Sequence, residues 1–324
     1  MQKQLNLLYN RYKLFFRELD EFVDPRPSGT AKALMFLDSI IAHIMHGASP
    51  TDYIIFEFWR KSNRERSTFI TMRRFLNMLD KYNDKKKTNL FRSKNEFNRV
   101  FSQFLKRSWL DLSSCTYEEF KEFIFLHKKV LIKPNRGFEG RGIHTLDFSK
   151  NDLDENALFE DLRKQKVIME EVITRGVLSE FNPSSINSIR IVTLLTGDTT
   201  EIKYANIKMG RGDILTDNFG SGGIVAVVDA NTGIIVTRGT NKKKEWFITH
   251  PTSGKQIIGY QIPRWEDIVN TVVTASKVVP EVRHVGWDVT INEAGEVVII
   301  EGNDNSDRAI QLIDQVGRRK IFSA

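Results

Sequence analysis

Apolar residues in the first third of the chain recur at the three- and four-residue steps of amphipathic helices. The pattern predicts one helix over residues 2–22, a second that continues to about Met45, and two more after a break at residues 47–51. Two further helices are expected to begin at Ser93 and at Tyr117. The chain is therefore expected to open with a helical domain.

From residue 130 onward the hydrophobic pattern changes to short apolar runs rich in β-branched residues, which predict strands. Helices are expected among them at residues 151–164 and 265–279. The predicted strands are residues 130–134, 167–173, 189–196, 202–209, 224–229, 234–237, 286–292 and 297–303. This order of helices and hairpins is typical of an α+β protein.

The last two predicted strands bring polar side chains together. They flank residues 293–296, which have the length and the glycine of a β-hairpin connection. In an antiparallel pair Asp288 comes opposite the end of the second strand, where Glu301 and Asn303 share one face. Oxygen ligands without His or Cys suit Mg²⁺, which completes its shell with phosphates and water. The hairpin predicts a magnesium site beside a nucleotide; the alternative is a solvated strand edge.

A loop with three glycines, residues 135–142, directly follows the strand predicted at 130–134. Backbone N–H groups of such a loop can face a phosphate chain, and Lys133, Arg136 and Arg141 add positive charge. The loop has neither the Gly-Lys-Ser/Thr ending of a Walker loop nor the spacing of the dinucleotide fingerprint. Phosphate binding and a merely flexible turn both remain open for it.

Cationic side chains also lie within or just after the predicted hairpin strands, at Arg190, Lys208 and Arg211. A cation inside a buried strand needs an anion, which is either a bound triphosphate or a structural carboxylate. The strand at 167–173 carries two acids near its end and either offers backbone groups to an adenine edge or connects two domains.

Charge is unevenly distributed along the 324 residues, which have an ordinary globular composition of 40% hydrophobic and 27% charged residues. Of the net charge of +7, residues 1–107 contribute +10, from 21 Lys and Arg against 11 Asp and Glu. The asymmetry is compatible with nucleic acid, an anionic surface or an anionic sugar nucleotide. The aromatic residues of this part keep helical spacing, which favours a buried core over a stacking groove.

The single cysteine, Cys115, excludes an internal disulfide, and the first residues lack a secretory signal pattern. The longest apolar stretch of the N-terminal part, residues 33–45, is interrupted by Asp38 and His43 and is shorter than the roughly 20 residues of a membrane helix. We therefore expect a cytoplasmic protein without a transmembrane segment.

Seven motifs in the order found here resemble the ATP-grasp superfamily, and within it the branch called sugar-transfer-associated ATP-grasp. The resemblance runs from about Tyr53 to the end of the chain. Each motif is weak alone, and their order makes the signal. The motifs are Leu131–Pro134 with its glycine loop, Met169–Ile173, Asn182–Arg190, Asp217–Ile224, His250–Gly254, Gly286–Val289 and Glu301–Asn303.

The resemblance implies an α+β ATP-grasp fold, in which two α+β subdomains clasp ATP, preceded by a helical N-terminal domain. The expected helical, basic domain comprises residues 1–90, where relatives usually have an α/β domain. The expected ATP-grasp region comprises residues 91–324, with a lid-like subdomain at about 128–175 and a C-terminal subdomain with the metal site at 176–324.

The resemblance also implies roles for individual residues. Lys133 would bind phosphate oxygens beneath the glycine loop, residues 170–173 would form the adenine hinge, and Glu180 would bind ribose. Asp288, Glu301 and Asn303 match the ligands of Mg²⁺, of which two ions are expected. The implied ATP-binding residues are Lys94, Lys133, Gly137, Gly140, Gly142, Glu170, Glu171, Val172, Ile173 and Glu180.

Three cations, Arg190, Lys208 and Arg211, look like the catalytic clamp on the triphosphate and the reaction intermediate. In the superfamily a Pro-Gly turn commonly follows the residue that matches Asn303. Residues 304–308 take its place here, and by the resemblance this loop borders the acceptor site. The resemblance therefore says least about the identity of the substrate. The implied substrate-binding residues are Asp217, Asn218, Gly222, Gly223, Asn305 and Arg308.

The activity that the resemblance implies is that of an ATP- and Mg²⁺-dependent carboxylate–amine ligase acting through an acyl phosphate. The expected substrates are a sugar or sugar nucleotide and an amino acid or similar amine, joined in surface polysaccharide biosynthesis. No nucleic-acid partner is expected, and peripheral contact with a membrane is left open. The alternatives are an ATP-grasp kinase acting on a sugar or related substrate and a non-enzymatic basic module that binds polyanions.

Overall fold

The computed structural model describes residues 2–23, 26–137, 141–149, 154–173, 175–213, 217, 219–306, 308 and 310–322. The chain divides into two compact units, one made of residues 1–82 with 307–324 and the other of residues 83–306. The first boundary thus lies at residue 82, where the sequence suggested 90. The C-terminal residues belong to the helical unit because their hydrogen bonds are made there.

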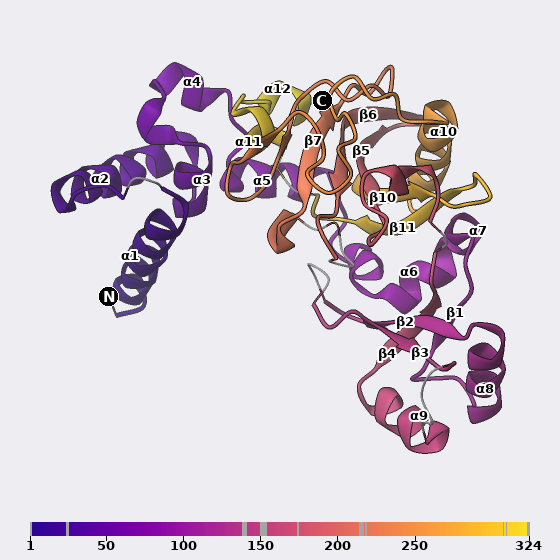
Figure 1. The fold of residues 1–324 in the computed structure, drawn as a ribbon. Coiled ribbons are helices and arrows are strands. Elements are labelled where there is room, and N and C mark those ends of the chain that lie inside the picture. The colour runs from indigo at the N-terminus through magenta and orange to yellow at the C-terminus, as the bar shows by residue number, and fades with distance from the viewer. Residues whose placement is uncertain are drawn as a thin grey trace. The chain divides into compact units, whose positions relative to one another are not determined.

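Helices make up the first unit, as the periodicity predicted. Ser28 caps the start of α2, because its side chain accepts a hydrogen bond from the Ala31 N–H. Gly47 ends that helix with φ +69°, and a Cβ there would collide with Arg73. The elements, drawn in Figure 1, are α1 (Gln2–Phe22), α2 (Gly29–His46), α3 (Pro50–Ile55), η1 (Phe58–Arg60), α4 (Asn63–Ser67), α5 (Met72–Tyr82), α11 (Ile310–Asp314) and α12 (Arg319–Phe322).

The core of the helical unit is aromatic. Phe15, Tyr53, Phe56, Phe58 and Phe69 are almost completely buried and pack together in one cluster. The ring centroids of Phe56 and Phe69 are 5.0 Å apart, a distance typical of packed aromatic pairs. These rings therefore form a core, as their helical spacing predicted.

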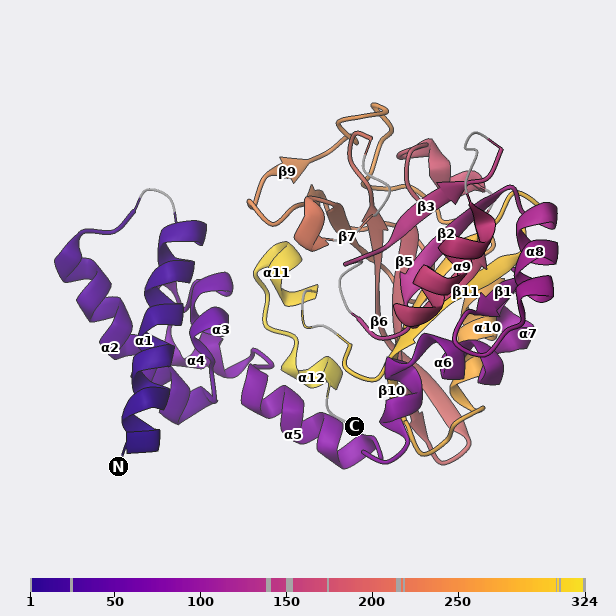
Figure 2. The same cartoon turned by 90° about the horizontal axis from the view of Figure 1, so that it is seen from below.

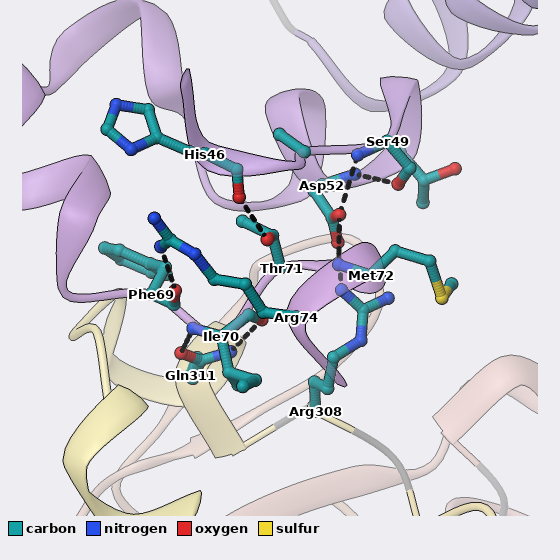
Figure 3. Close-up of polar contacts among 12 residues, drawn as sticks. His46, Ser49, Asp52, Phe69, Ile70, Thr71, Met72, Arg74, Arg308 and Gln311 are labelled. Atoms are coloured by element: carbon teal, nitrogen blue, oxygen red, sulfur yellow. Dashed lines mark hydrogen bonds and ion pairs between the residues drawn. The ribbon is translucent and has the colours of Figure 1, made fainter. Parts of the chain in front are cut away.

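The C-terminal segment completes this unit through hydrogen bonds to main-chain groups (Figure 3). The Gln311 side chain accepts from the Ile70 N–H at 2.8 Å and donates to the Ile70 carbonyl at 3.1 Å. The Arg319 N–H donates to the Thr68 carbonyl at 2.7 Å. Asp52, fully buried, accepts from the N–H groups of Ser49 and Met72 and from Arg308.

A four-stranded antiparallel sheet lies in the second unit, with strand order β1-β4-β2-β3. Its strands are β1 (Trp109–Asp111), β2 (Lys129–Pro134), β3 (His144–Asp147) and β4 (Val167–Glu171). Helices α8 (Tyr117–Leu126) and α9 (Glu155–Lys164) share a buried core with it, which includes Phe120, Ile132, Phe159 and Met169. Figure 1 and Figure 2 show both helices beside this sheet. Because β1 pairs with β4, the subdomain begins before the expected residue 128.

A seven-stranded antiparallel sheet forms the rest of residues 83–306, in the order β11-β10-β5-β6-β7-β8-β9. The strand expected at residues 234–237 is absent from the described structure, where only isolated bridges occur at Ile234 and Ile235. The strands are β5 (Ser188–Thr196), β6 (Thr199–Met209), β7 (Ile224–Val228), β8 (Gly239–Thr240), β9 (Trp246–Phe247), β10 (His284–Ile291) and β11 (Val297–Asn303). The helices of this unit besides α8 and α9 are η2 (Thr88–Arg92), α6 (Lys94–Val100), α7 (Ser102–Leu105), η3 (Val177–Glu180), η4 (Phe219–Ser221) and α10 (Trp265–Ser276).

The two faces of the larger sheet differ in polarity because successive side chains alternate. Ile189, Ile191 and Val289 belong to the apolar core that includes α10, and Trp287 lies 5.4 Å from the Phe101 ring. Several alternate positions on β5, β6 and β10 are polar or charged, among them Ser188, Arg190, Lys208 and Asp288. The sheet therefore has one apolar face for packing and one polar face available for chemistry.

Candidate functional site

A pocket within residues 83–306 brings together predicted site residues that are distant in the sequence. Its empty volume is about 450 Å³. Lysines and acids line it beside the aromatic rings of Phe91 and Phe97. The predicted residues at the pocket are Lys94, Lys133, Gly137, Glu170, Glu301 and Asn303. Charged groups from both sheets and an apolar wall therefore share one cavity.

Glu170 is the most enclosed acid of this pocket, with 2% of its surface exposed. Its carboxylate accepts hydrogen bonds from Lys133 Nζ at 2.6 Å, from Arg107 Nε at 3.0 Å and from Asn98 Nδ2 at 3.0 Å. Burial alone would raise the pKa of Glu170, but the charges of Arg107 and Lys133 outweigh burial and hold this pKa below the usual range of glutamate. The carboxylate is thus ionised and held by two cations.

Lys94, at the start of α6, differs from Lys133 and Arg107 because it does not pair with Glu170. Burial, with a smaller effect of Lys133, lowers its pKa, although Glu301 and Glu170 act in the opposite direction. Its ammonium donates to the Gly137 carbonyl at 3.4 Å, and no carboxylate among the described residues lies within ion-pair distance of it. A partly desolvated cation without a close acid is stabilised by an added anion, such as a phosphate.

The β10–β11 hairpin has the predicted register. Asp288 lies directly opposite Glu301, and Gly286 lies opposite Asn303. The register shifts directly after Asp288, which is in the middle of β10 rather than early in it, because the strand begins at His284. Asn303 Nδ2 donates to Glu301 Oε1 at 3.2 Å, so these two side chains meet on the polar face.

Asp288 lies 3% exposed between two cations of neighbouring strands. Arg190 binds both carboxylate oxygens, with Nη2 to Oδ2 at 2.9 Å, and Lys208 Nζ donates to Oδ2 at 2.9 Å. Burial would raise the pKa of Asp288, but these two charges hold it well below the usual range. Of the two anions left open for Arg190, the structure therefore supplies the carboxylate.

Asp217 joins the same cluster from the loop before β7. It is buried, and the Ser188 hydroxyl donates to it. Burial raises the pKa of Asp217 even though Lys208 lies near enough to lower it. For Lys208, burial acts to lower the pKa, but Asp288 and Asp217 raise it overall. The lysine ammonium is therefore stabilised in its charged form on the polar face.

The donor set at the pocket fits Mg²⁺ only in partnership with a phosphate ligand. Among the residues that the structure describes, no group of three or more His, Cys, Asp or Glu side chains is placed to hold a metal ion. Glu301 and the amide oxygen of Asn303 offer hard oxygen ligands, whereas Asp288 is already occupied by Arg190 and Lys208. Mg²⁺ commonly takes one or two carboxylates and completes its shell with phosphates and water.

The hinge residues lie at the end of β4. The Glu171 carboxylate accepts the Ser108 N–H at 3.0 Å, and the Glu171 N–H donates to the Ser108 carbonyl at 2.9 Å. Val172 and Ile173 follow and are partly exposed. Glu180 pairs with Lys255 and is not among the described residues that line the pocket. The structure therefore brings Glu170, but not Glu180, to the two lysines that were predicted to bind phosphate.

The other predicted residues lie in several places. Arg211 is exposed, pairs with Glu245 at 3.3 Å and lies over the Phe247 ring. Gly142 has φ +76°, and a Cβ there would lie 2.9 Å from Pro134. Gly222 and Gly223 lead into β7, and Asn305 is exposed. Asn218 and Gly140 lie outside the described residues.

Arg308 is part of the helical unit, where its guanidinium contacts the buried Asp52. This ion pair gives Arg308 a structural partner in addition to the role in substrate binding that the resemblance implies.

Two partners of Glu170, Arg107 and Asn98, were not predicted from the sequence. Arg107 stands in the run Lys106-Arg107-Ser108, which is typical of an exposed connector, and nothing local indicates its burial. Asn98 follows Lys94 by four residues, and this spacing places both on one helix face. That periodicity was the available signal for Asn98.

Two antiparallel sheets around a pocket of lysines, acids and amides agree with an ATP-grasp fold. The sequence matches the sugar-transfer associated ATP-grasp family over residues 73–323. The chain belongs to this family. The match begins within the helical unit, in α5, and runs through the C-terminal segment.

Comparison with solved structures shows remote similarity to ATP-grasp ligases. The ATP-grasp ligase PsnB with its minimal precursor is 14% identical, with a TM-score of 0.47 over 80% of this chain and 69% of that chain. The RiPP-associated ATP-grasp ligase of Chryseobacterium gregarium, in complex with ADP and a leader and core peptide, is 15% identical, with a TM-score of 0.44 over 74% and 61%.

The L-amino acid ligase from Bacillus licheniformis is 14% identical to this chain, with a TM-score of 0.42 over 68% of it. The matched region spans 42% of the length of that ligase. No curated protein sequence matches the chain. Among the described residues, no helix has the length and apolarity to cross a membrane.

Proposed function

We propose that residues 83–306 bind ATP with Mg²⁺ and that the protein is an ATP-dependent carboxylate–amine ligase. The observation that carries this proposal is the convergence of Lys94, Lys133, Glu301 and Asn303 on one pocket. Lys94 is partly desolvated and lacks a close described acid, which is the state of a cation prepared for a phosphate. Family membership supports the same ligand.

The proposed chemistry is a phosphoryl transfer followed by acyl transfer. A substrate carboxylate oxygen attacks the γ-phosphorus, ADP leaves, and an acyl phosphate forms. An amine then attacks the acyl carbon, phosphate leaves with the electron pair of the C–O bond, and the amine nitrogen loses a proton. Such transfer depends mainly on positioning and charge stabilisation, so no protein nucleophile is required.

The residues supply these functions from the pocket and from the polar face. Lys94 and Lys133 would bind the phosphates, and Glu301 with Asn303 would hold Mg²⁺, which neutralises the phosphate charge when bound. Arg190 and Lys208 remain our proposed clamp on the transferred group, with Asp288 as their resting partner. Glu170 to Ile173 remain the proposed adenine hinge.

The description of the family as sugar-transfer associated supports a sugar or sugar nucleotide as one substrate, with an amino acid or similar amine as the other. We extend this proposal to surface polysaccharide biosynthesis in the cytoplasm. Burial raises the pKa of the Cys115 thiol to about 11, so this thiol takes no part in the proposed chemistry.

Hydroxylamine trapping tests the reaction. Purified protein with ATP and Mg²⁺ is offered hexuronic acids, their sugar nucleotides and amino acids in separate reactions, and ADP and hydroxamate are measured together. A hydroxamate formed with one panel identifies the activated carboxylate and supports the ligase. ADP with a phosphorylated sugar and no hydroxamate would replace the ligase with a kinase. Absence of ADP in every reaction would contradict an ATP-consuming enzyme acting on these classes.

A further inference from the structure

Arg107 is a fully engaged, buried arginine that the predicted catalytic set does not include. Its side chain is 1% exposed. Besides the bond from Nε to Glu170 Oε2, Nη2 donates to Glu170 Oε1 at 3.2 Å and to the Ile300 carbonyl at 3.0 Å. Nη1 donates to the carbonyls of Ile299 at 2.8 Å and Leu105 at 3.3 Å. All five guanidinium N–H groups therefore have an acceptor.

Two of these acceptors belong to β11, the edge strand of the seven-stranded sheet. Arg107 donates to the carbonyls of Ile299 and Ile300, at the point where the register of β11 with β10 shifts. They directly precede Glu301, one of the proposed magnesium ligands. Arg107 thus joins the acid of β4 in one sheet to the strand that presents Glu301 in the other.

The charge balance around Glu170 explains why two cations are needed. Lys133 must leave Glu170, at least in part, to bind a phosphate, and a buried carboxylate left without a cation is strongly disfavoured. With Arg107 in place Glu170 keeps a bidentate partner when Lys133 moves. Without Arg107 the carboxylate would compete with the phosphate for the same ammonium.

We propose that Arg107 is a positioning residue that releases Lys133 for the nucleotide by keeping Glu170 neutralised, while its bonds to β11 fix the guanidinium beside Glu170. This inference rests on the proposed ATP site. It concerns only residues 83–306, in which all the participating groups lie.

A double-mutant cycle with MgADP as the probe tests the inference by isothermal titration calorimetry, with melting temperatures measured in parallel. Arg107→Met should raise the Kd of MgADP at least tenfold, and Arg107→Lys should raise it less. Adding Glu170→Gln to Arg107→Met should recover at least threefold of the loss, because a neutral amide does not retain Lys133. Arg99→Met is the matched control: Arg99 is half-exposed and pairs with Asp111, and its loss should leave the Kd unchanged.

The outcomes separate this inference from the proposed site. Unchanged affinity in Arg107→Met, or a double variant as weak as the single one, would overturn the positioning role and leave a structural one. Absence of MgADP binding by the wild-type protein, or wild-type affinity in Lys133→Met, would instead remove the site itself. Should Arg107→Met fail to fold, Glu170→Gln is compared with the double variant. Less than a threefold difference supports the inference, and a larger loss contradicts it.

Discussion

Two of the buried acids of residues 83–306, Glu170 and Asp288, have the same kinds of partner but different connections. Each is ionised, and each is held by one arginine and one lysine. The partners of Asp288 lie on β5 and β6, so its cluster belongs to a single sheet. Glu170 lies on β4, and its arginine also binds β11 of the other sheet. The Asp288 cluster therefore links strands of one sheet, whereas the Glu170 cluster links the two sheets.

This difference indicates separate roles for similar chemistry. Buried ion pairs are weak evidence for stability, because the loss of hydration offsets much of the attraction. Their retention is easier to explain when one member has a second task. In both clusters the lysine is the member that a phosphate can attract, since a single ammonium changes partners more readily than a bidentate guanidinium.

Lys133→Met should have the largest effect on activity. Removing the ammonium that we propose binds phosphate should lower ADP formation by at least about 100-fold, or about 3 kcal/mol of transition-state stabilisation. The fold should survive because Arg107 still neutralises Glu170. Steady-state ADP release and circular dichroism measure the two properties. Lys129→Met, at an exposed position of the same strand, should keep wild-type turnover, and equal losses in both variants would contradict the assignment.

Asp288→Asn sharpens the comparison by leaving Arg190 and Lys208 buried without their shared acid. Removing one partner of a buried ion pair typically costs about 3–5 kcal/mol of unfolding free energy. Urea denaturation followed by tryptophan fluorescence reports this loss, since Trp287 lies on the neighbouring position of β10. Asp267→Asn breaks an exposed pair with Arg264 and should cost less than about 1 kcal/mol. A similar loss of unfolding free energy in both variants would show that the buried Asp288 cluster matters no more for stability than an exposed ion pair.

The pH dependence of stability separates these acids from His284, which lies on β10 together with Asp288. The pKa values of Glu170 and Asp288 are lowered, so their contributions are present above about pH 4 and are lost only as the pH falls further. Burial lowers the pKa of His284 to about 4, so the folded state resists a proton that the unfolded state accepts below the ordinary histidine pKa of 6.5. Stability should therefore fall between pH 6.5 and 4, by about 3 kcal/mol at most.

Urea denaturation across this pH range checks the prediction with two histidine variants. His284→Asn should flatten the decline, while His144→Asn, at an exposed position of β3, should leave it unchanged. A slope that persists in His284→Asn would assign the decline to His46 and His250, whose pKa values burial also lowers.

Arg308→Met probes an ion pair of the helical unit and should have the smallest functional effect. Asp52 keeps its bonds from the N–H groups of Ser49 and Met72 but loses its cation, which should cost about 1–3 kcal/mol of stability. The KM for ATP should change less than twofold. If the KM for the acceptor substrate rises at least tenfold with unchanged melting temperature, Arg308 acts on the substrate rather than on Asp52.

Short-range sequence patterns predicted the elements whose residues are close together in the chain. The β10–β11 hairpin followed from two apolar runs and a glycine turn, whereas the opposition of Asp288 and Glu301 also depends on the register shift after Asp288. The aromatic core of the helical unit likewise followed from helical spacing. The resemblance to a family supplied Lys133 and Glu170, which no local pattern joins.

Contacts between residues that are distant in the sequence were not predicted. The return of the C-terminal segment to the helical unit depends on bonds such as that between Gln311 and Ile70, which are 241 positions apart. The ion pair of Lys133 with Glu170, and the burial of Arg107 against both sheets, arise only when distant strands meet. A sequence period describes one element, and it carries no information about which charges the packing of several elements will enclose.

The change of partner by Lys133 is the central claim, and a crystal structure with Mg²⁺ and a non-hydrolysable ATP analogue tests it most directly. The account predicts Lys133 Nζ within hydrogen-bond distance of a phosphate oxygen, Glu170 retained by Arg107, and Glu301 with Asn303 at the magnesium ion. A nucleotide bound elsewhere, or Lys133 still bound only to Glu170 beside a filled pocket, would contradict it.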